Sequence, residues 1–314
     1  MKFLDKITRN EARFQRYIGV SFKQLDLLTQ RLEATWNKAE FARLNREGRT
    51  RGVGGGHPYK LRQTRDKIIA VLLYYKQYIT QELLGDLIEI DQANISRLLK
   101  KMLPLIEEAA DPALKIYLAQ AKDDCQKRIG TLRELHERHP DLRDVSTDAN
   151  EQQCFRSQNY EIQKKYYSGK SKQHTIKTQI SVAIRGRILD VSKSYPGSIH
   201  DKKIIDEEKT IEKFDERVPH RFDSGYQGIK KEHPDHYLIL PAKKPKEREL
   251  VPIEKEHNRA NSKRRIIVEH ALARIQKFRI CATKFRQPLS VHNQTFRNIV
   301  ALLNFKLECP MAIK

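Results

Sequence analysis

The feature that most constrains the fold is a change of hydrophobic pattern near Pro140. Before it, apolar residues recur at steps of three and four, as on one face of a helix. After it, every second residue belongs to one predicted buried face, which is the two-residue period of a strand. These residues are Ile176, Thr178, Ile180, Val182 and Ile184. A turn at 185–187 and further apolar alternation then predict a β-hairpin over 175–193. The chain should therefore contain an all-helical part followed by an α/β part.

The N-terminal part is predicted to form several helices. One runs from about Ser21 to Asn45, and Asp66 to Gln77 is a strongly apolar second one. Between them, residues 45–60 carry three consecutive glycines and should form an exposed loop. The alternative, a phosphate-binding loop, lacks the strand before it and the helix with Lys-Ser/Thr after it that such loops need.

Two short helices follow, separated by a three-residue break. Thr80 should cap the first, which runs to about Ile88, and Asp91 should cap the second. The buried face of the second helix is predicted to comprise Ile95, Leu98, Leu99 and Met102. Its solvent face would present a polar and basic set suited to a DNA groove: Gln92, Ser96, Arg97, Lys100 and Lys101. The pair indicates a helix-turn-helix, with a small bundle bearing a solvated face as the alternative.

Charge favours a polyanionic partner. The 314 residues include 61 Lys and Arg against 40 Asp and Glu, a net charge of +21. Nucleic acid suits this excess better than a membrane surface, because no basic segment with a clean aromatic face appears. The four cysteines are scattered, which indicates inert thiols in a reducing compartment. Since no apolar run approaches bilayer length, we expect a soluble, cytoplasmic protein.

Three acidic residues stand in distinctive settings in the α/β part. Asp148 lies in DANEQ, close to a predicted strand, although the residues just before it are more polar than is usual in a central strand. Asp223 lies in FDSGYQG, at the end of a short predicted strand. Glu269 lies in RIIVEH on a helix predicted from about 260 to 280, beside an apolar stripe and pointing inward. Carboxylates brought together by folding can hold two divalent ions for phosphodiester cleavage, and hard oxygen ligands select Mg²⁺ or Mn²⁺.

A set of motifs in fixed order resembles the DDE-type transposases of the bacterial insertion-sequence-five group and their Harbinger relatives. The motifs, spread over most of residues 140–305, are YYSGK (166–170), HTIKTQ (174–179), YPGSIHD (195–201), DSGYQG (223–228), RIIVEH (265–270) and FRI (278–280). The N-terminal part also looks like the helix-turn-helix domain of that family in Thr80–Leu87 and Leu98–Pro104. Six motifs in the correct order are far more specific than any one of them.

The resemblance implies an RNase H-like mixed-sheet catalytic core preceded by an all-α helix-turn-helix domain. It implies that Asp148, Asp223 and Glu269 form the catalytic and metal-binding triad with two Mg²⁺ or Mn²⁺ ions. We expect an N-terminal helical segment with a glycine-rich loop over 1–60, the helix-turn-helix over 61–110, a helical linker over 111–140 and the catalytic domain over 141–314.

The resemblance also implies phosphate contacts by Arg265 and by a basic residue after the glutamate. Position 276, where relatives tend to carry Lys, is Gln here, and Lys277 is the expected substitute. Asn150 and Ser157 also depart from the family pattern, although none of these changes removes a predicted metal ligand.

Other residues compete for roles at this site. Asp201 and Glu151 are candidate supporting ligands; His200 is a candidate to orient water or Asp201, with a structural role as the alternative. Lysines interleaved with aromatic residues over 164–177 suit contacts to phosphates, among them Lys170, Lys172 and Lys177. A merely solvated charged loop is the alternative.

The expected activity is therefore that of a metal-dependent endonuclease and strand transferase. It would bind double-stranded DNA at the ends of a mobile element, cut it and join the 3′-hydroxyl ends to target DNA. Joining two ends predicts a homodimer or larger assembly in the DNA complex, located at the bacterial nucleoid in the cytoplasm, with no membrane partner. The alternatives are an inactivated or host-adopted descendant that binds DNA without cutting it, or one that cuts without joining.

Overall fold

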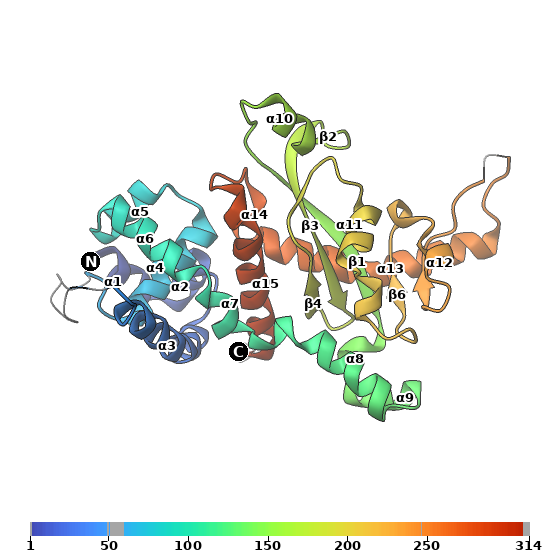
Figure 1. Cartoon of the computed structure of the whole chain (residues 1–314), viewed down its shortest axis with the longest axis horizontal. Coiled ribbons are helices and arrows are strands. Elements are labelled where there is room, and N and C mark those ends of the chain that lie inside the picture. Colours follow the sequence, from blue (N-terminus) through green and yellow to red (C-terminus); the bar gives the residue numbers. More distant parts are fainter. Residues whose placement is uncertain (1, 49, 51–59, 246, 310–314) are drawn as a thin grey trace. The chain divides into compact units, whose positions relative to one another are not determined.

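The computed structural model describes residues 2–48, 50, 60–245 and 247–309 (Figure 1). The chain divides into two compact units. The first comprises Met1–Pro112, Gln276–Ala282 and Gln294–Lys314, and the second comprises Ala113–Ile275 and Thr283–Asn293. The assignment of functions to segments 1–60, 61–110, 111–140 and 141–314 stays a prediction. Most of the predicted loop over 45–60 lies outside the described residues.

Helices form the first unit. In its N-terminal part they are α1 (Lys2–Thr8), α2 (Glu11–Ile18), α3 (Phe22–Leu44), α4 (Thr64–Gln77), α5 (Gln81–Ile88), α6 (Gln92–Met102) and α7 (Leu105–Ala110). Helix α4 is central, with every residue from Lys67 to Tyr75 buried. Residues from α14 (Arg279–Ala282) and α15 (His292–Glu308) complete the unit. Asn298 of α15, for example, donates its Nδ2 to the Tyr75 hydroxyl at 3.1 Å and to the Leu103 carbonyl at 2.8 Å.

The predicted helix pair is α5 and α6. The Thr80 hydroxyl accepts a hydrogen bond from the Leu83 N–H at 3.1 Å, so its predicted capping role is confirmed. The Asp91 prediction is wrong, because that residue precedes α6 but its side chain accepts no capping hydrogen bond. Leu98 is half-buried rather than fully in the core. Gly85 allows the tight turn, since a Cβ there would overlap the carbonyl oxygen of Ile90.

The second unit is built on a seven-stranded mixed sheet in the order β2-β3-β1-β6-β7, with β4 and β5 also paired to β3. The strands are β1 (Val145–Gln153), β2 (Tyr167–Ser168), β3 (Gln173–Ala183), β4 (Ile188–Val191), β5 (Tyr195–Pro196), β6 (His220–Arg221) and β7 (Leu238–Ile239). Strand β3 pairs antiparallel with β1, β2, β4 and β5, whereas β6 is parallel to both β1 and β7. The predicted hairpin over 175–193 is thus confirmed as β3 and β4.

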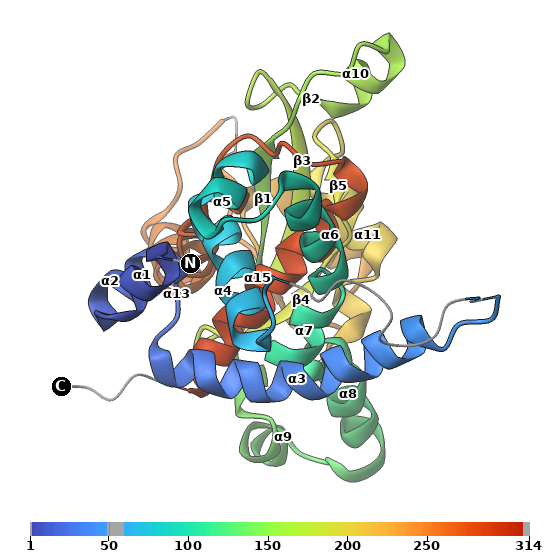
Figure 2. The same ribbon diagram turned by 90° about the vertical axis from the view of Figure 1, so that its left-hand side faces the viewer.

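The sheet is covered on both sides, which the sequence pattern did not predict. In β3 every residue from Thr175 to Ala183 is buried, of both parities. Ile184, expected on the buried face, is exposed just after the strand ends. Figures 1 and 2 show the reason: α11 (Asp201–Glu208) lies on one side of the sheet and α13 (Pro252–Gln276) on the other. A central strand between two helices does not need polar residues on alternate positions.

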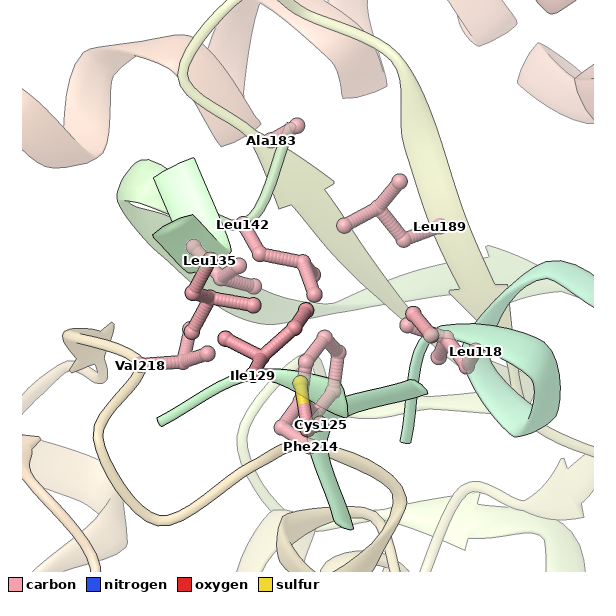
Figure 3. Close-up of a cluster of buried hydrophobic side chains, with 11 residues drawn as sticks. Leu118, Cys125, Ile129, Leu135, Leu142, Ala183, Leu189, Phe214 and Val218 are labelled. Atoms are coloured by element: carbon pink, nitrogen blue, oxygen red, sulfur yellow. The ribbon is translucent and has the colours of Figure 1, made fainter. Parts of the chain in front are cut away.

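Helices α8 (Tyr117–Arg128) and α9 (Leu132–Arg138) pack against the beginning of β1. Figure 3 shows the buried side chains that join them, including Leu118, Leu135 and Leu142, together with Phe214 and Val218 from later in the chain. Cys125 lies within this cluster, and burial raises the pKa of its thiol to about 11, which disfavours the reactive thiolate form.

Short helical turns complete the described structure: η1 (Pro112–Lys115), η2 (Pro140–Arg143), α10 (Tyr160–Tyr166), η3 (Ile211–Lys213), η4 (Ser224–Tyr226), α12 (Ile229–Glu232) and η5 (Leu289–Val291). The long late helix begins at Pro252 and ends at Gln276, earlier at both ends than predicted. None of the described helices is apolar over the length that a bilayer crossing requires.

Candidate active site

The sheet register brings Asp148 and Asp223 together. Asp148 lies in the middle of β1, opposite Ile180 of β3, although the residues before it are polar. On its other side β1 runs parallel to β6, with Ser146 paired to Arg221. Continuing both chains by two residues leads from this pair to Asp148 and Asp223, on the same side of the pleat. Asp223 lies just past the strand end, as predicted.

The Asp223 side chain is held by the turn that follows it. Its Oδ1 accepts a hydrogen bond from the Gly225 N–H at 2.8 Å, at the start of η4. Gly225 suits this arrangement because a Cβ there would already lie only 3.0 Å from that oxygen. Among the described residues the second carboxylate oxygen has no hydrogen-bond partner, so it is available to a ligand beyond the end of β6.

Burial is the main influence on the ionisation of Asp148. Burial raises the pKa of its carboxyl above the ordinary value, and the charges of Asp223 and Asp201 raise it further. The Ala149 N–H and Arg265 act in the opposite direction. Arg265 reaches from α13 and places its Nη2 at 3.1 Å from the Asp148 Oδ2. Arg265 is thus a cation of the folded protein that partly offsets the charge of Asp148.

Glu269 is placed by α13 one turn after Arg265. Residues four apart lie on the same helix face, so Glu269 follows Arg265 along the side of α13 that reaches β1. The expectation that it points inward is wrong: Glu269 is exposed, while Val268, Ala271 and Ile275 form the buried stripe. Exposure leaves its carboxylate accessible to a ligand.

The described residues contain a different preformed acidic group. The ligand atoms of Asp206, Glu232 and His233 all lie within 4.8 Å of one another, and the predicted triad is not part of this group. Lys202 already places its Nζ at 2.7 Å from Glu232 and 3.6 Å from Asp206. A lysine thus supplies the positive charge there.

The candidate supporting residues have separate structural roles. Asp201 accepts a hydrogen bond from the Lys177 Nζ at 2.9 Å, and its charge acts on Asp148. Glu151 has the opposite parity to Asp148 on β1 and accepts hydrogen bonds from Thr175 at 2.6 Å and Ser171 at 3.0 Å. Although burial raises the pKa of Glu151, such hydrogen bonds bring it below the ordinary value.

His200 precedes α11, and its Nδ1 accepts a hydrogen bond from the Lys202 N–H at 3.3 Å. This helix-capping contact is the structural alternative considered for it.

Two further residues near the acids carry no sequence signal for their roles. Tyr226, of the DSGY run, is fully buried, and its hydroxyl accepts a hydrogen bond from Gln179 Nε2 at 2.8 Å. Burial, then the charges of Asp148 and Asp201, raise the pKa of Tyr226 well above its ordinary value, so the hydroxyl stays protonated.

Asp144 directly precedes β1 and links it to β6 and α13. It accepts hydrogen bonds from the Arg221 Nε at 2.7 Å and from Arg264 Nη1 at 3.0 Å. Because Arg264 belongs to α13, this buried carboxylate helps to hold the helix that carries Arg265 and Glu269.

The residues predicted to bind DNA differ in accessibility. On α6, Gln92, Arg97 and Lys100 are exposed, whereas Lys101 is half-buried and pairs with Glu40 at 3.1 Å.

In the second unit, Lys170 and Lys172 are exposed in the turn before β3. Lys177 is buried and bonded to Asp201 and the Ile199 carbonyl, which leaves no surface for a phosphate. Arg265 is largely buried, with side-chain exposure of 14%. Lys277 is exposed and belongs to the first unit.

Comparison with known proteins gives two family matches. Residues 147–304 match the model of the DDE superfamily endonuclease, and residues 59–112 match the helix-turn-helix of DDE superfamily endonuclease. The first match begins at Thr147 and includes all three predicted acids. The fold class expected from the sequence, an RNase H-like mixed α/β core preceded by a helix-turn-helix, is confirmed.

A curated relative is the probable transposase for insertion sequence element IS702 of Microchaete diplosiphon. It is 33% identical over 145 residues, which are 46% of this chain and 51% of the relative. The chain thus matches about half the length of that protein. No solved structure matches the chain.

Proposed function

Because this chain belongs to the DDE superfamily endonucleases, we propose that it is a DNA transposase that cuts element ends and joins them to target DNA. The observation that carries the proposal is that Asp148 of β1 and Asp223, just past the end of the parallel strand β6, lie close enough for their charges to interact, beside a helix that contributes Arg265 and Glu269. Asp148, Asp223 and Glu269 are the proposed catalytic residues.

The residues suit divalent ions. The three carboxylates offer only hard oxygen donors, which Mg²⁺ and Mn²⁺ prefer, and the charges of Asp223 and Asp201 both act on Asp148. Two such ions, when bound, activate the attacking oxygen and stabilise the departing one. Asp201 acts on this site through its charge and through its ion pair with Lys177.

Arg265 is proposed to serve the DNA as well as Asp148. Among the described residues its Nε has no hydrogen-bond partner, although that atom is buried. A guanidinium that holds a carboxylate with one nitrogen and has further donors can also bind a phosphate oxygen. Its place on α13 then aligns the scissile phosphate with the acids.

The helix-turn-helix supplies the second part of the proposal. Helix α6 presents Gln92, Arg97 and Lys100 to solvent, a set that can contact base edges and phosphates of double-stranded DNA. Lys170, Lys172 and Lys277 are exposed cations for further phosphate contacts. Joining two ends calls for a dimer or larger complex on the DNA, acting at the bacterial nucleoid in the cytoplasm.

The test compares Asp223→Asn with Asp206→Asn in a cleavage assay. The substrate is a plasmid carrying the repeats that flank the gene, with Mg²⁺ or Mn²⁺ present. Asp223→Asn should abolish cleavage and leave duplex binding intact, because it removes a metal ligand and not a DNA contact. The control Asp206→Asn alters the other acidic group and should cut normally. Cleavage that survives the first change but not the second would transfer the assignment to the Asp206 group.

The products separate the remaining alternatives. Joined molecules, seen as labelled ends covalently linked to a second plasmid, indicate a transposase. Cut ends without joined molecules would indicate an adopted nuclease, and binding without cutting by the unaltered protein would indicate an inactivated descendant.

A further inference from the structure

A short helix between β1 and β3 has no buried residue. Helix α10 (Tyr160–Tyr166) and the chain around it, residues 155–172, are called the arm here. Figures 1 and 2 both show α10 and β2 extending beyond the other strands of the second unit. A seven-residue helix is too short to be stable by itself, and helices in proteins depend mainly on an apolar face packed against a neighbour. This helix has no such face.

The base of the arm is nevertheless held in place. Tyr167 and Ser168 of β2 pair with His174 and Gln173 of β3. The Ser198 N–H donates to the Lys165 carbonyl at 3.3 Å. Within the arm, the Asn159 side chain caps α10 by accepting from the Ile162 N–H at 3.2 Å. The arm is therefore fixed by backbone and polar contacts and by the edge-on packing of the Tyr167 ring on His174, while most of its large apolar side chains are exposed.

Large apolar side chains on the arm are unusually exposed. Tyr160 is 72% exposed and Phe155 is 56% exposed, and Ile162 and Tyr167 are exposed as well. Lys284 already places its Nζ at 4.8 Å from the Phe155 ring centre, so this ring attracts cations. Exposed apolar groups gathered in one short segment indicate a binding surface.

The same segment is strongly basic. Its exposed cations are Arg156, Lys164, Lys165, Lys170 and Lys172, against one acid, Glu161. Tyr160 and Lys164 are four residues apart on α10 and thus lie on the same face. A ring beside an ammonium group can stack on a base while the charge meets the neighbouring phosphate.

We propose that the arm binds unpaired nucleotides of the DNA, with Tyr160 stacking on a base and Lys164 contacting phosphate. Unpaired bases have free faces, whereas the bases of a duplex are already stacked on each other. A protein partner is disfavoured, because lysine is depleted from the core of protein interfaces. The proposal takes only the DNA partner from the proposed function.

The strand that leads to the arm also sets its distance from the acids. Asp148 lies five residues before Gln153, where β1 ends and the chain enters the arm. At about 3.3 Å per residue this is roughly 17 Å along the strand.

The test measures binding of the full chain by fluorescence anisotropy, in EDTA, over a series of salt concentrations. The probes are a labelled oligothymidylate of about 20 nucleotides and a blunt duplex of equal length. Tyr160→Ala should weaken oligothymidylate binding about tenfold, as loss of a base stack does, and change duplex binding less than twofold. The salt dependence should stay the same, because no charge is removed. Lys164→Ala should instead reduce the magnitude of the logarithmic salt slope by about 0.7.

The matched control is Tyr237→Ala, which removes a ring of similar exposure, 57%, outside the arm. It should leave both probes unaffected. Equal effects of Tyr160→Ala and Tyr237→Ala would overturn the proposal, and so would a Tyr160→Ala variant that binds normally but loses self-association in sedimentation velocity. Circular dichroism should show that Tyr160→Ala remains folded, since α10 contributes nothing to the core.

Failure here is distinguishable from failure of the proposed function. The binding test uses no metal and no cleavage, so an inactive protein can still show the arm's effect. Conversely, if the protein cleaves DNA but Tyr160→Ala binds oligothymidylate as tightly as the unaltered protein, only the proposal about the arm is refuted.

Discussion

The fully buried His220 should make the protein sensitive to mild acid. Its Nε2 lies 2.6 Å from the Thr147 hydroxyl, which in turn lies 2.6 Å from that of Ser181. The rings of Phe214 and Phe222 lie against it, with centres at 4.7 and 4.3 Å. Its Nδ1 has no hydrogen-bond partner among the described residues, so a proton there would be a buried, unpaired charge.

Burial, assisted by the charge of His236, lowers the pKa of His220 to about 3. Above an unfolded-state pKa of about 6.5, both states are neutral and the histidine has no effect on stability. As the pH falls below that value, His220 becomes protonated in the unfolded chain but stays neutral in the folded chain. The free energy of unfolding then drops by about 1.4 kcal/mol per pH unit until the folded pKa is reached. At pH 5 the loss should be about 2 kcal/mol.

The assay is urea unfolding followed by circular dichroism at pH 7.5 and pH 5.0. The unaltered protein should lose about 2 kcal/mol more between these conditions than His220→Phe, which keeps a ring but cannot take a proton. His270→Phe, at an exposed position on α13, should lose as much as the unaltered protein. Equal losses in the unaltered protein and in His220→Phe would refute the reasoning, as would NMR titration of the His220 ring near pH 6.5.

Three further changes test the packing. Leu135→Ala empties part of the cluster in Figure 3 and should cost about 2–5 kcal/mol in urea unfolding, whereas Leu132→Ala, exposed on the same helix, should cost under about 0.5 kcal/mol. Gly85→Ala should lower the unfolding free energy by about 1–3 kcal/mol and weaken duplex binding, because the new methyl group meets backbone; Gly169→Ala, with open space around it, should leave duplex binding unchanged. Asp144→Ala leaves two guanidinium groups without their carboxylate and should cost about 3–5 kcal/mol, measured by the same unfolding; a loss under 1 kcal/mol would contradict its role.

Local signals in the sequence were enough to predict several elements. Ser21 begins α3 with a reciprocal capping box with Gln24, and Thr80 begins α5, because a cap depends on residues within one turn. The alternation over β3 and the turn before β4 likewise act between near neighbours. The predicted acids came from short motifs, and Asp223 was correctly expected at a strand end because the turn residues follow it directly.

Partners distant in sequence explain what the pattern missed. Ile184 was expected inside but lies outside, because β3 ends at Ala183 before that residue. Lys177 was expected on the surface, but Asp201 and the Ile199 carbonyl hold its ammonium inside. Neither outcome follows from the residue type, since it depends on which later segment covers the strand.

The sequence by itself determined the helix pair, the hairpin and which acids stand in distinctive motifs, because caps, turns and periodicity act over a few residues. Only the tertiary structure decided that the parallel pairing of β1 with β6 brings Asp148 near Asp223, and that Arg265, 117 residues away, binds Asp148. It also decided that Glu269 is exposed and that no residue of α10 is buried. These outcomes follow from sheet register and helix docking, in which each residue's environment is made by distant parts of the chain.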